Sequence, residues 1–405
     1  MSKDKNYKEI ILSAFKMNVR QYAMIIALLA IWLIFSVITK VVYGEFIYLT
    51  PRNLSNLFIQ SATVAILAIG MTLIIVAGHI DLSVGSVLGF CGAVAAMLMI
   101  RLNMPVIPTI LITIIVGVII GLWHGYWVAY KGVPAFIVSL ASMLAFRGAI
   151  IGITGGQTQG LEMAPKATAA AFRTIGQAYL PKINQNLPFH DTSLYFCLAF
   201  IILFWIFDFQ KRRNKLKYGF KVLPMELQIL KNIIISVFIA LISSIMIFYM
   251  GIPYSIILVL VLTLLFSFIA NNTTFGRHLY AIGGNIEAAR LSGINIRLKV
   301  LLLFMMMGIM TSIAGIVYTS RLNAATTSAG VNAELDAIAS TVIGGTSLMG
   351  GEGTIIGAVI GALVMTSLDN GMSLLNLDIT FQYIIKGLIL LMAVWFDIST
   401  RKKTR

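Results

Sequence analysis

Long apolar runs alternate with short polar gaps along almost the whole chain. A helix needs about 20 predominantly apolar residues to cross the hydrocarbon layer of a membrane, and most of the runs approach that length. Within lipid the backbone must satisfy its own hydrogen bonds, which a helix does internally. The pattern therefore predicts an all-α polytopic membrane protein with about 12 transmembrane segments. The predicted segments are residues 22–38, 58–77, 83–100, 105–123, 134–153, 193–207, 232–250, 253–270, 300–319, 337–349, 354–371 and 382–396.

Lysine and arginine are distributed unevenly among the polar gaps. If the N-terminal arm, residues 1–21, is cytoplasmic, the inner gaps hold roughly three times as many basic residues as the outer gaps. This bias predicts that both termini are cytoplasmic and that residues 1–405 form a single transmembrane domain. The first run is followed by Lys40 and bulky residues rather than a small-residue cleavage site, so we expect a retained span. The basic loop at 211–221 is expected to set the topology and to touch anionic membrane lipids.

The composition supports a membrane location. The chain is 59% hydrophobic and 11% charged, whereas a soluble domain carries about 25% charged residues. The net charge of +15 does not indicate nucleic-acid binding, because the basic residues lie in the gaps rather than along one surface. Cys91 and Cys197 both lie in apolar runs, so we expect neither a disulfide nor a metal site. The sequence contains no phosphate-binding loop and no set of catalytic residues, so we expect no catalytic site and no bound cofactor.

Two segments are interrupted by glycine and polar residues. Residues 337–349 are too few for a full span and include Gly344 and Gly345, so we expect a half-helix. The first half of the chain has a similar break at 77–85, in front of a helix of small residues. Paired breaks in two halves of a membrane protein point to a transport path. The candidate pathway residues are Asp81, Ser83, Gly85, Gly344, Gly345, Thr346 and Ser347.

Acidic residues precede or open the helices at both breaks. Asp81 either caps the next helix, or it or Ser83 also meets the transported solute. For Glu334 and Asp336 we expect capping, or the docking of a partner from outside, rather than contact with a solute.

Several charged or titratable residues fall inside or near the ends of apolar runs. A charge at the middle of a bilayer costs about 2.5–3.5 kcal/mol on insertion scales, so each must be paired, reach the interface or face water. Arg147 and Lys386 are the deepest of these residues. We expect His124, Asp369 and Glu352 to extend from helix ends towards the interface.

Glycines repeat at four-residue spacing in several runs. Gly117, Gly121 and Gly125 form one such series, and Gly353, Gly357 and Gly361 form another. Ridges of small residues let helices approach closely in lipid, so we expect these helices to be packed inside the bundle. The alternative is that they also slide against one another and let the bundle alternate between open states.

The gap at 271–299 is polar, rich in glycine and basic, and the bias of charges places it in the cytoplasm. Its sequence Glu287-Ala288-Ala289, followed by Gly293, resembles the coupling loop of ABC-importer permeases, which presses against a separate ATPase. The candidate coupling residues are Gly283, Gly284, Asn285, Glu287, Ala288, Ala289 and Gly293.

Six motifs, in the same order, resemble the inner-membrane permeases of ribose-, xylose- and galactose-type sugar ABC importers. They are Asp81-Leu82-Ser83-Val84-Gly85, Val133-Pro134-Ala135-Phe136-Ile137-Val138 with Leu144-Ala145-Phe146-Arg147-Gly148 after it, the loop 276–293, Glu334-Leu335-Asp336-Ala337-Ile338-Ala339, Ile343-Gly344-Gly345-Thr346-Ser347-Leu348 and Gln382-Tyr383-Ile384-Ile385-Lys386-Gly387. Within the family the chain is most similar to xylose permeases, because both carry an extra hairpin, here 193–250.

The resemblance implies a fold like that of the vitamin B12-type (type II) importers, with the hairpin inserted, in the bacterial cytoplasmic (inner) membrane. It implies alternating access for a monosaccharide, D-xylose. The implied partners are a tandem-domain ABC ATPase that uses ATP and Mg, a periplasmic or lipoprotein sugar-binding protein, and a second copy of the permease. Glu287 would orient a short docking helix or pair with a basic ATPase residue, and Gly293 would allow a tight turn or a close approach.

Two alternatives stay open, one with another cargo and one in another class. An ABC permease of this scaffold could carry ribose, galactose, a nucleoside or a branched-chain amino acid. A secondary transporter driven by an ion gradient would need carboxylates at the middle of the membrane in several spans. The acidic residues here lie mostly at span ends, which disfavours that class.

Overall fold

The computed structural model describes residues 19–220 and 222–402, so residues 1–18 of the predicted N-terminal arm lie outside the described part. The described chain is almost entirely helical. Two strands of two residues each, β1 (Gln159–Gly160) and β2 (Ala324–Ala325), pair antiparallel. The chain divides into two compact units, and the smaller contains residues 50–55 and 179–253. The larger contains residues 20–49, 56–178 and the chain from residue 254 onwards.

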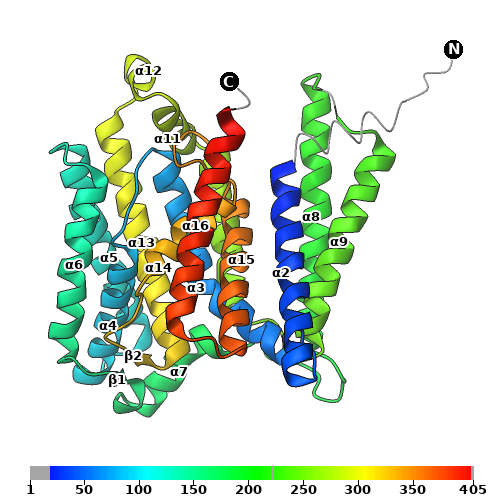
Figure 1. Ribbon diagram of the computed structural model, residues 1–405, viewed down its shortest axis with the longest axis horizontal. Coiled ribbons are helices and arrows are strands. Elements are labelled where there is room, and N and C mark those ends of the chain that lie inside the picture. The colour runs from blue at the N-terminus through cyan, green and yellow to red at the C-terminus, as the bar shows by residue number, and fades with distance from the viewer. Residues whose placement is uncertain (1–18, 221, 403–405) are drawn as a thin grey trace. The chain divides into compact units, whose positions relative to one another are not determined.

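The larger unit is a bundle of long helices with shorter elements between them (Figure 1). The first residue of α2, Val19, and the first five residues of α3, 51–55, are assigned to the smaller unit. The helices assigned to this bundle are α2 (Val19–Tyr43), α3 (Pro51–Val76), α4 (Val84–Arg101), α5 (Val106–Ala129), α6 (Ala135–Thr154), η1 (Leu161–Met163), α7 (Lys166–Gln177), α10 (Tyr254–Asn272), α11 (Thr274–Gly284), α12 (Ile286–Leu291), α13 (Ile296–Leu322), α14 (Ala333–Ile343), α15 (Ile355–Leu374) and α16 (Ile379–Lys402).

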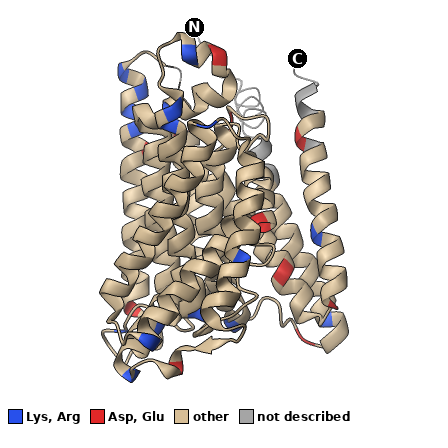
Figure 2. Cartoon of the chain, turned by 90° about the vertical axis from the view of Figure 1, so that its left-hand side faces the viewer, with Lys and Arg blue, Asp and Glu red and all other residues tan. Residues whose placement is uncertain are grey.

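Each predicted segment overlaps a helix, and eleven of the described helices are long and apolar enough to cross a membrane. The prediction of an all-α polytopic membrane protein is therefore confirmed. Short helix α7, which lies in a predicted outer gap, was not anticipated. In the view of Figure 2 most charged residues lie towards the ends of the helices, as expected for chains that cross lipid.

The predicted segment that is too short to cross a membrane corresponds to the half-helix α14. It has 11 residues, which is a length of about 16 Å and too short for the hydrocarbon layer. The prediction of a half-helix is correct, but its predicted bounds of 337–349 are wrong at both ends. The helix starts at Ala333 and stops at Ile343, because Gly345 adopts a left-handed φ of 86° and turns the chain away.

Glycine ridges allow the inner helices to approach closely, as their four-residue spacing predicts. On α5, Gly117 faces Gly308 and Gly121 faces the backbone of Phe304, so that α5 and α13 meet backbone to backbone. A side chain at either position would overlap a carbonyl oxygen of α13. On α15, Gly361 packs in the same way against Ser340 of α14. These contacts fix α13 and the half-helix within the bundle.

Helix α3 is the most enclosed membrane-length helix of the described chain. Of its most apolar stretch, 89% of the residues are buried. It leads directly into the break at residues 77–83, so the break starts from a rigidly packed helix.

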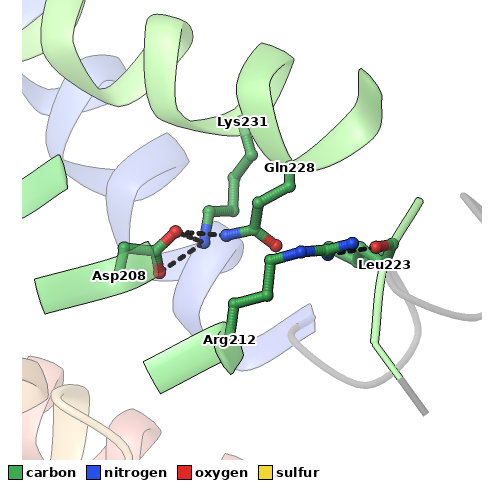
Figure 3. Close-up of polar contacts among 5 residues, drawn as sticks. All are labelled: Asp208, Arg212, Leu223, Gln228 and Lys231. Carbon is green, nitrogen blue, oxygen red and sulfur yellow. Dashed lines mark hydrogen bonds and ion pairs between the residues drawn. The ribbon is translucent and has the colours of Figure 1, made fainter. Parts of the chain in front are cut away.

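The smaller unit contains the hairpin of α8 (Asp191–Lys217) and α9 (Met225–Ile247), which begins two residues before the range 193–250 predicted for the inserted hairpin. A polar cluster joins the two helices (Figure 3). Lys231 lies 3.0 Å from Asp208, and Gln228 also donates a hydrogen bond to that carboxylate. Arg212 donates to the carbonyl oxygen of Leu223. These contacts hold together two helices that otherwise expose apolar side chains such as Ile202 and Leu241.

Candidate functional site

The predicted coupling segment folds into two helices, α11 and α12, joined at Asn285. The Asn285 side chain accepts a hydrogen bond from the backbone N–H of Ala288 at 2.9 Å, so it caps the start of α12. At the other end, Gly293 has a φ of 78°, and the N–H groups of Gly293 and Ile294 donate to the carbonyls of Arg290 and Ala289. This pattern is a Schellman motif, which ends a helix tightly. Both ends of a helix of only six residues are therefore fixed.

Of the two roles expected for Gly293, the structure shows the tight turn. No atom lies within 4 Å of the position that a Cβ would take at Gly293, so nothing approaches closely there. Glycine is needed for its left-handed φ rather than for space.

The outer face of α12 carries both charged and apolar side chains. Glu287 and Arg290 form an ion pair at 3.4 Å, with both side chains 65% exposed. A pair so exposed contributes little to folding, so its role is not to stabilise the helix. Leu291 is 89% exposed and Ile286 is 45% exposed, whereas Ala289 is buried and holds the helix to the bundle. The segment presents a short, rigid, partly apolar surface.

The C-terminal end of α11 contacts both broken elements. A Cβ on Gly283 would overlap the carbonyl oxygen of Val76, the last residue of α3. The N–H of Gly351 donates to that same carbonyl at 2.8 Å, and the Tyr280 hydroxyl donates to the carbonyl of Gly353 at 2.8 Å. The coupling segment, the break after α3 and the loop before α15 therefore meet at the carbonyl group of Val76. Sequence reasoning missed these contacts, although the glycine pairs at 283–284 and 350–351 were a signal of close approach.

The candidate pathway residues at the first break are engaged with one another. Asp81 Oδ1 accepts hydrogen bonds from the N–H of Ser83 at 2.8 Å and from its hydroxyl at 2.6 Å, and both residues are buried. Ser83 is the N-cap residue of α4, so Asp81 orders the turn in front of the helix rather than capping it. Gly85 packs against Gly330 and Glu334. Burial lowers the pKa of His79, two residues before Asp81, below its ordinary value of 6.5.

The second break is formed by a series of left-handed glycines. Gly345, Gly350 and Gly351 have φ values of 86°, 82° and 76°. Thr346 and Ser347 are fully buried, and Gly344 packs against Gly357 of α15. The structure does not bring the seven candidate residues into one cluster. Gly85 meets the start of the half-helix α14, whereas the group at 344–347 lies at its other end.

The two deepest charges are paired. Lys386 of α16 lies 3.1 Å from the carboxylate of Asp336 and 2.8 Å from that of Asp369. Arg147 of α6 donates to the carbonyl of Ala329 at 2.7 Å. Both residues therefore satisfy the condition that a buried charge must find partners.

Three expectations about nearby residues are wrong. Asp336 neither caps α14 nor faces an outside partner, because its carboxylate is buried against Lys386. Asp369 does not extend to the interface but joins the same ion pair. His124 is 3% exposed and lies against the rings of Phe146 and Phe304. In each case a partner distant in the sequence offered a better environment than the interface.

Membrane-length helices, a half-helix and a rigid polar segment in contact with two broken elements define the class as a polytopic transport protein. The chain belongs to the family described as branched-chain amino acid transport system / permease component, whose sequence model matches residues 53–212 and 214–394. It is therefore the permease component of a transport system rather than an enzyme. No solved structure matches it, so the predicted likeness to vitamin B12-type importers stays a prediction.

Three curated relatives are permeases of sugar transport systems. The xylose transport system permease protein of Escherichia coli K12 is 44% identical over 96% of this chain and 94% of its own length. The corresponding protein of Haemophilus influenzae is 43% identical over 95% and 98%. The ribose import permease protein of Bacillus subtilis is 34% identical over 88% and 87%. The resemblance to sugar permeases is confirmed, and these xylose permeases are more similar than this ribose permease, as the motifs and the hairpin predict.

Proposed function

We propose that the chain forms the membrane passage of an ATP-driven ABC importer for a monosaccharide, D-xylose. The observation that carries this proposal is the identity of 44% with a xylose permease over nearly the full length of both chains. The match extends across the inserted hairpin, so it covers the feature that favoured xylose permeases over the shorter ribose type.

The contacts of α11 support a mechanism of coupling. A partner that presses on α12 would move α11, because Asn285 caps the joint between them. Gly283 bears directly on Val76 and on the loop at 350–351, so a displacement there reaches both broken elements together. Packed backbones transmit displacement with little loss because no flexible side chain lies between them. Alternating access would follow from movement of the two breaks and the half-helix.

The proposal includes the partners and their sides. An ATPase with two nucleotide-binding domains, which holds ATP and Mg, would dock on α12 in the cytoplasm. A sugar-binding protein would deliver the cargo from outside, and a second copy of the permease would complete the passage. Both termini would be cytoplasmic and the membrane would be the inner membrane of a bacterium, as the positive-inside bias favours.

The family description leaves the cargo to be tested, because it names branched-chain amino acids. The test is uptake of labelled solutes into proteoliposomes that contain the permease with its ATPase and its binding protein. We expect uptake of D-xylose that requires ATP on the ATPase side, less uptake of D-ribose, and none of L-leucine. The matched control contains an ATPase variant that binds but does not hydrolyse ATP.

Two results would contradict the proposal. One is uptake of L-leucine in preference to D-xylose. The other is uptake by the permease alone when a proton or sodium gradient is imposed.

A further inference from the structure

The start of the half-helix α14 lies against the start of α4. Gly85 is the second residue of α4, and its backbone packs against that of Gly330, three residues before α14 begins. A Cβ at Gly85 would overlap both the carbonyl oxygen of Gly330 and Oε2 of Glu334, the second residue of α14. The two helix starts are therefore in direct contact, and the Glu334 carboxylate lies at that contact.

The position of Glu334 lets its charge interact with both helix starts. The first N–H groups of a helix have no acceptor within it and give that end a partial positive charge, which attracts a carboxylate. Ser83, the N-cap residue of α4, and Asn332, the N-cap residue of α14, make no side-chain capping hydrogen bond. The carboxylate of Glu334 therefore supplies the negative charge that both helix ends favour.

This contact is electrostatic rather than hydrogen-bonded at Oε2. Glu334 is 8% exposed, and its Oε2 receives no hydrogen bond from the residues that the structure describes. Arg147 attracts the carboxylate, but its Nη1 donates to the carbonyl of Ala329. Asp81 and Asp336 repel the carboxylate. A charge attraction without a hydrogen bond is weaker than a hydrogen-bonded ion pair, so this contact is easy to release.

The other side of α14 is held more firmly. Asp336 follows Glu334 by two residues, which places the two side chains about 200° apart around the helix. Asp336 forms an ion pair of 3.1 Å with Lys386 of α16. Gly361 of α15 packs directly against the backbone of Ser340. The contact of α14 with α4 is therefore weaker than its contacts with α15 and α16.

We propose that the passage opens along the seam between the starts of α4 and α14, and that Glu334 is the positioning residue that closes this seam. In the closed state the carboxylate holds the two helix starts together. In the open state α4 and α14 separate, while α14 stays with α15 and α16. The link to transport rests on the proposed function, and Asp81 and Ser83 would then border the opening.

A buried thiol beside the seam reports its opening. Ser86 is fully buried in the first turn of α4, so Ser86→Cys, combined with Cys197→Ser, carries a thiol next to Gly85. Cys91 lies further along the same helix, is also fully buried, and serves as the internal control. The rate of modification of each thiol by a small polar reagent is measured by mass spectrometry. The sample is the purified permease in nanodiscs, without ATPase or sugar.

Removing the charge of Glu334 should open the seam. Glu334→Gln keeps the size of the side chain but loses the attraction to the helix ends. We therefore expect Ser86→Cys to be modified at least about tenfold faster, with Cys91 unchanged. Asp369→Asn is the matched control, because it removes the charge of a carboxylate at the contact of α15 with α16 instead. This control should leave Ser86→Cys as slow as in the parent protein.

The assembled transporter shows whether transport uses the same seam. The permease with Ser86→Cys is reconstituted with its ATPase and its sugar-binding protein, and D-xylose is supplied. Addition of ATP and Mg should speed modification of Ser86→Cys severalfold and leave Cys91 unchanged.

Four results would overturn the proposal. The first is unchanged, slow modification of Ser86→Cys in the Glu334→Gln variant. The second is equal acceleration of Ser86→Cys and Cys91, which would make Glu334 an ordinary core residue. The third is acceleration by Asp369→Asn as large as by Glu334→Gln. The fourth is normal ATP-driven uptake with no acceleration at Ser86→Cys, which would place the passage elsewhere.

Failure of the proposed function gives a different result. If Glu334→Gln exposes Ser86→Cys selectively but the wild-type transporter shows no ATP-driven uptake of D-xylose, the role of Glu334 stands and the proposed function fails.

Discussion

At the scale of single residues, Lys386 is the charge on which the packing of the half-helix depends. It joins α16 to Asp336 of α14 and to Asp369 of α15. Burying a charge is expensive, and removing one partner leaves the others uncompensated. The group therefore holds three helices in one arrangement.

Replacing the lysine by an apolar residue of similar length tests this role. Lys386→Met should destabilise the protein by about 3 kcal/mol, because two buried carboxylates lose their counter-charge. Thermal unfolding in detergent, followed by size-exclusion chromatography, measures the change. The variant Lys386→Met with Asp336→Asn should recover part of the loss, since it removes one unpaired charge. Equal stability of wild type and Lys386→Met would contradict the role given to this residue.

At the scale of elements, the joint between α11 and its neighbours is the feature on which coupling depends. Gly283 and Gly284 are adjacent in sequence but differ in surroundings. A Cβ at Gly283 would overlap the backbone of Val76 and crowd Gly351, whereas at Gly284 it would meet nothing within 4 Å. The pair provides a substitution and its control one residue apart.

Gly283→Ala should force the end of α11 away from α3 at a cost of about 1–3 kcal/mol, as overpacking does. We expect the reconstituted transporter to hydrolyse ATP with much less sugar uptake for each ATP consumed. Gly284→Ala should behave as the wild type in the same assay. If both variants couple normally, the contact with Val76 does not transmit movement.

The exposed face of α12 leads to a separate prediction about docking of the ATPase. Leu291 is 89% exposed and contributes little to folding, so Leu291→Asp should leave the unfolding temperature unchanged. Its affinity for the ATPase should fall about tenfold, because an apolar contact becomes a buried charge. Titration of labelled ATPase onto nanodiscs measures the affinity, with Glu287→Gln as a milder variant at the same face. Unchanged binding by Leu291→Asp would place the ATPase elsewhere.

At the scale of the whole molecule, the apolar pattern was enough to predict the class and nearly every long helix. The membrane makes this possible, because it forces each apolar run into a helix and sorts charges to its two sides. The ends of the half-helix were less accurate, since glycines at 344–345 stop it earlier than hydropathy suggests. Helix α7 is amphipathic and lies outside the apolar runs, so a search for apolar runs did not find it.

The contacts that build the site could not be read from one sequence. Asp336 and Lys386 are 50 residues apart, and Tyr280 and Gly353 are 73 apart. Periodicity identifies which face of a helix is apolar but not which distant residue will meet it. Local details are also hard to predict from the sequence, as Asp81 shows. The N-cap of α4 is Ser83 rather than Asp81, so the Asp81 side chain orders the turn before the helix instead of capping it.

The proposed function requires a separate ATPase that engages this chain from the cytoplasm through α12. Cross-linking from Ala288→Cys, an exposed position on that helix, tests the claim most directly. A short bifunctional reagent should join Ala288→Cys to the ATPase in membranes, whereas Met163→Cys, 62% exposed in a predicted outer gap, should give no such product. Cross-linking of the ATPase to Met163→Cys, with none to Ala288→Cys, would contradict it.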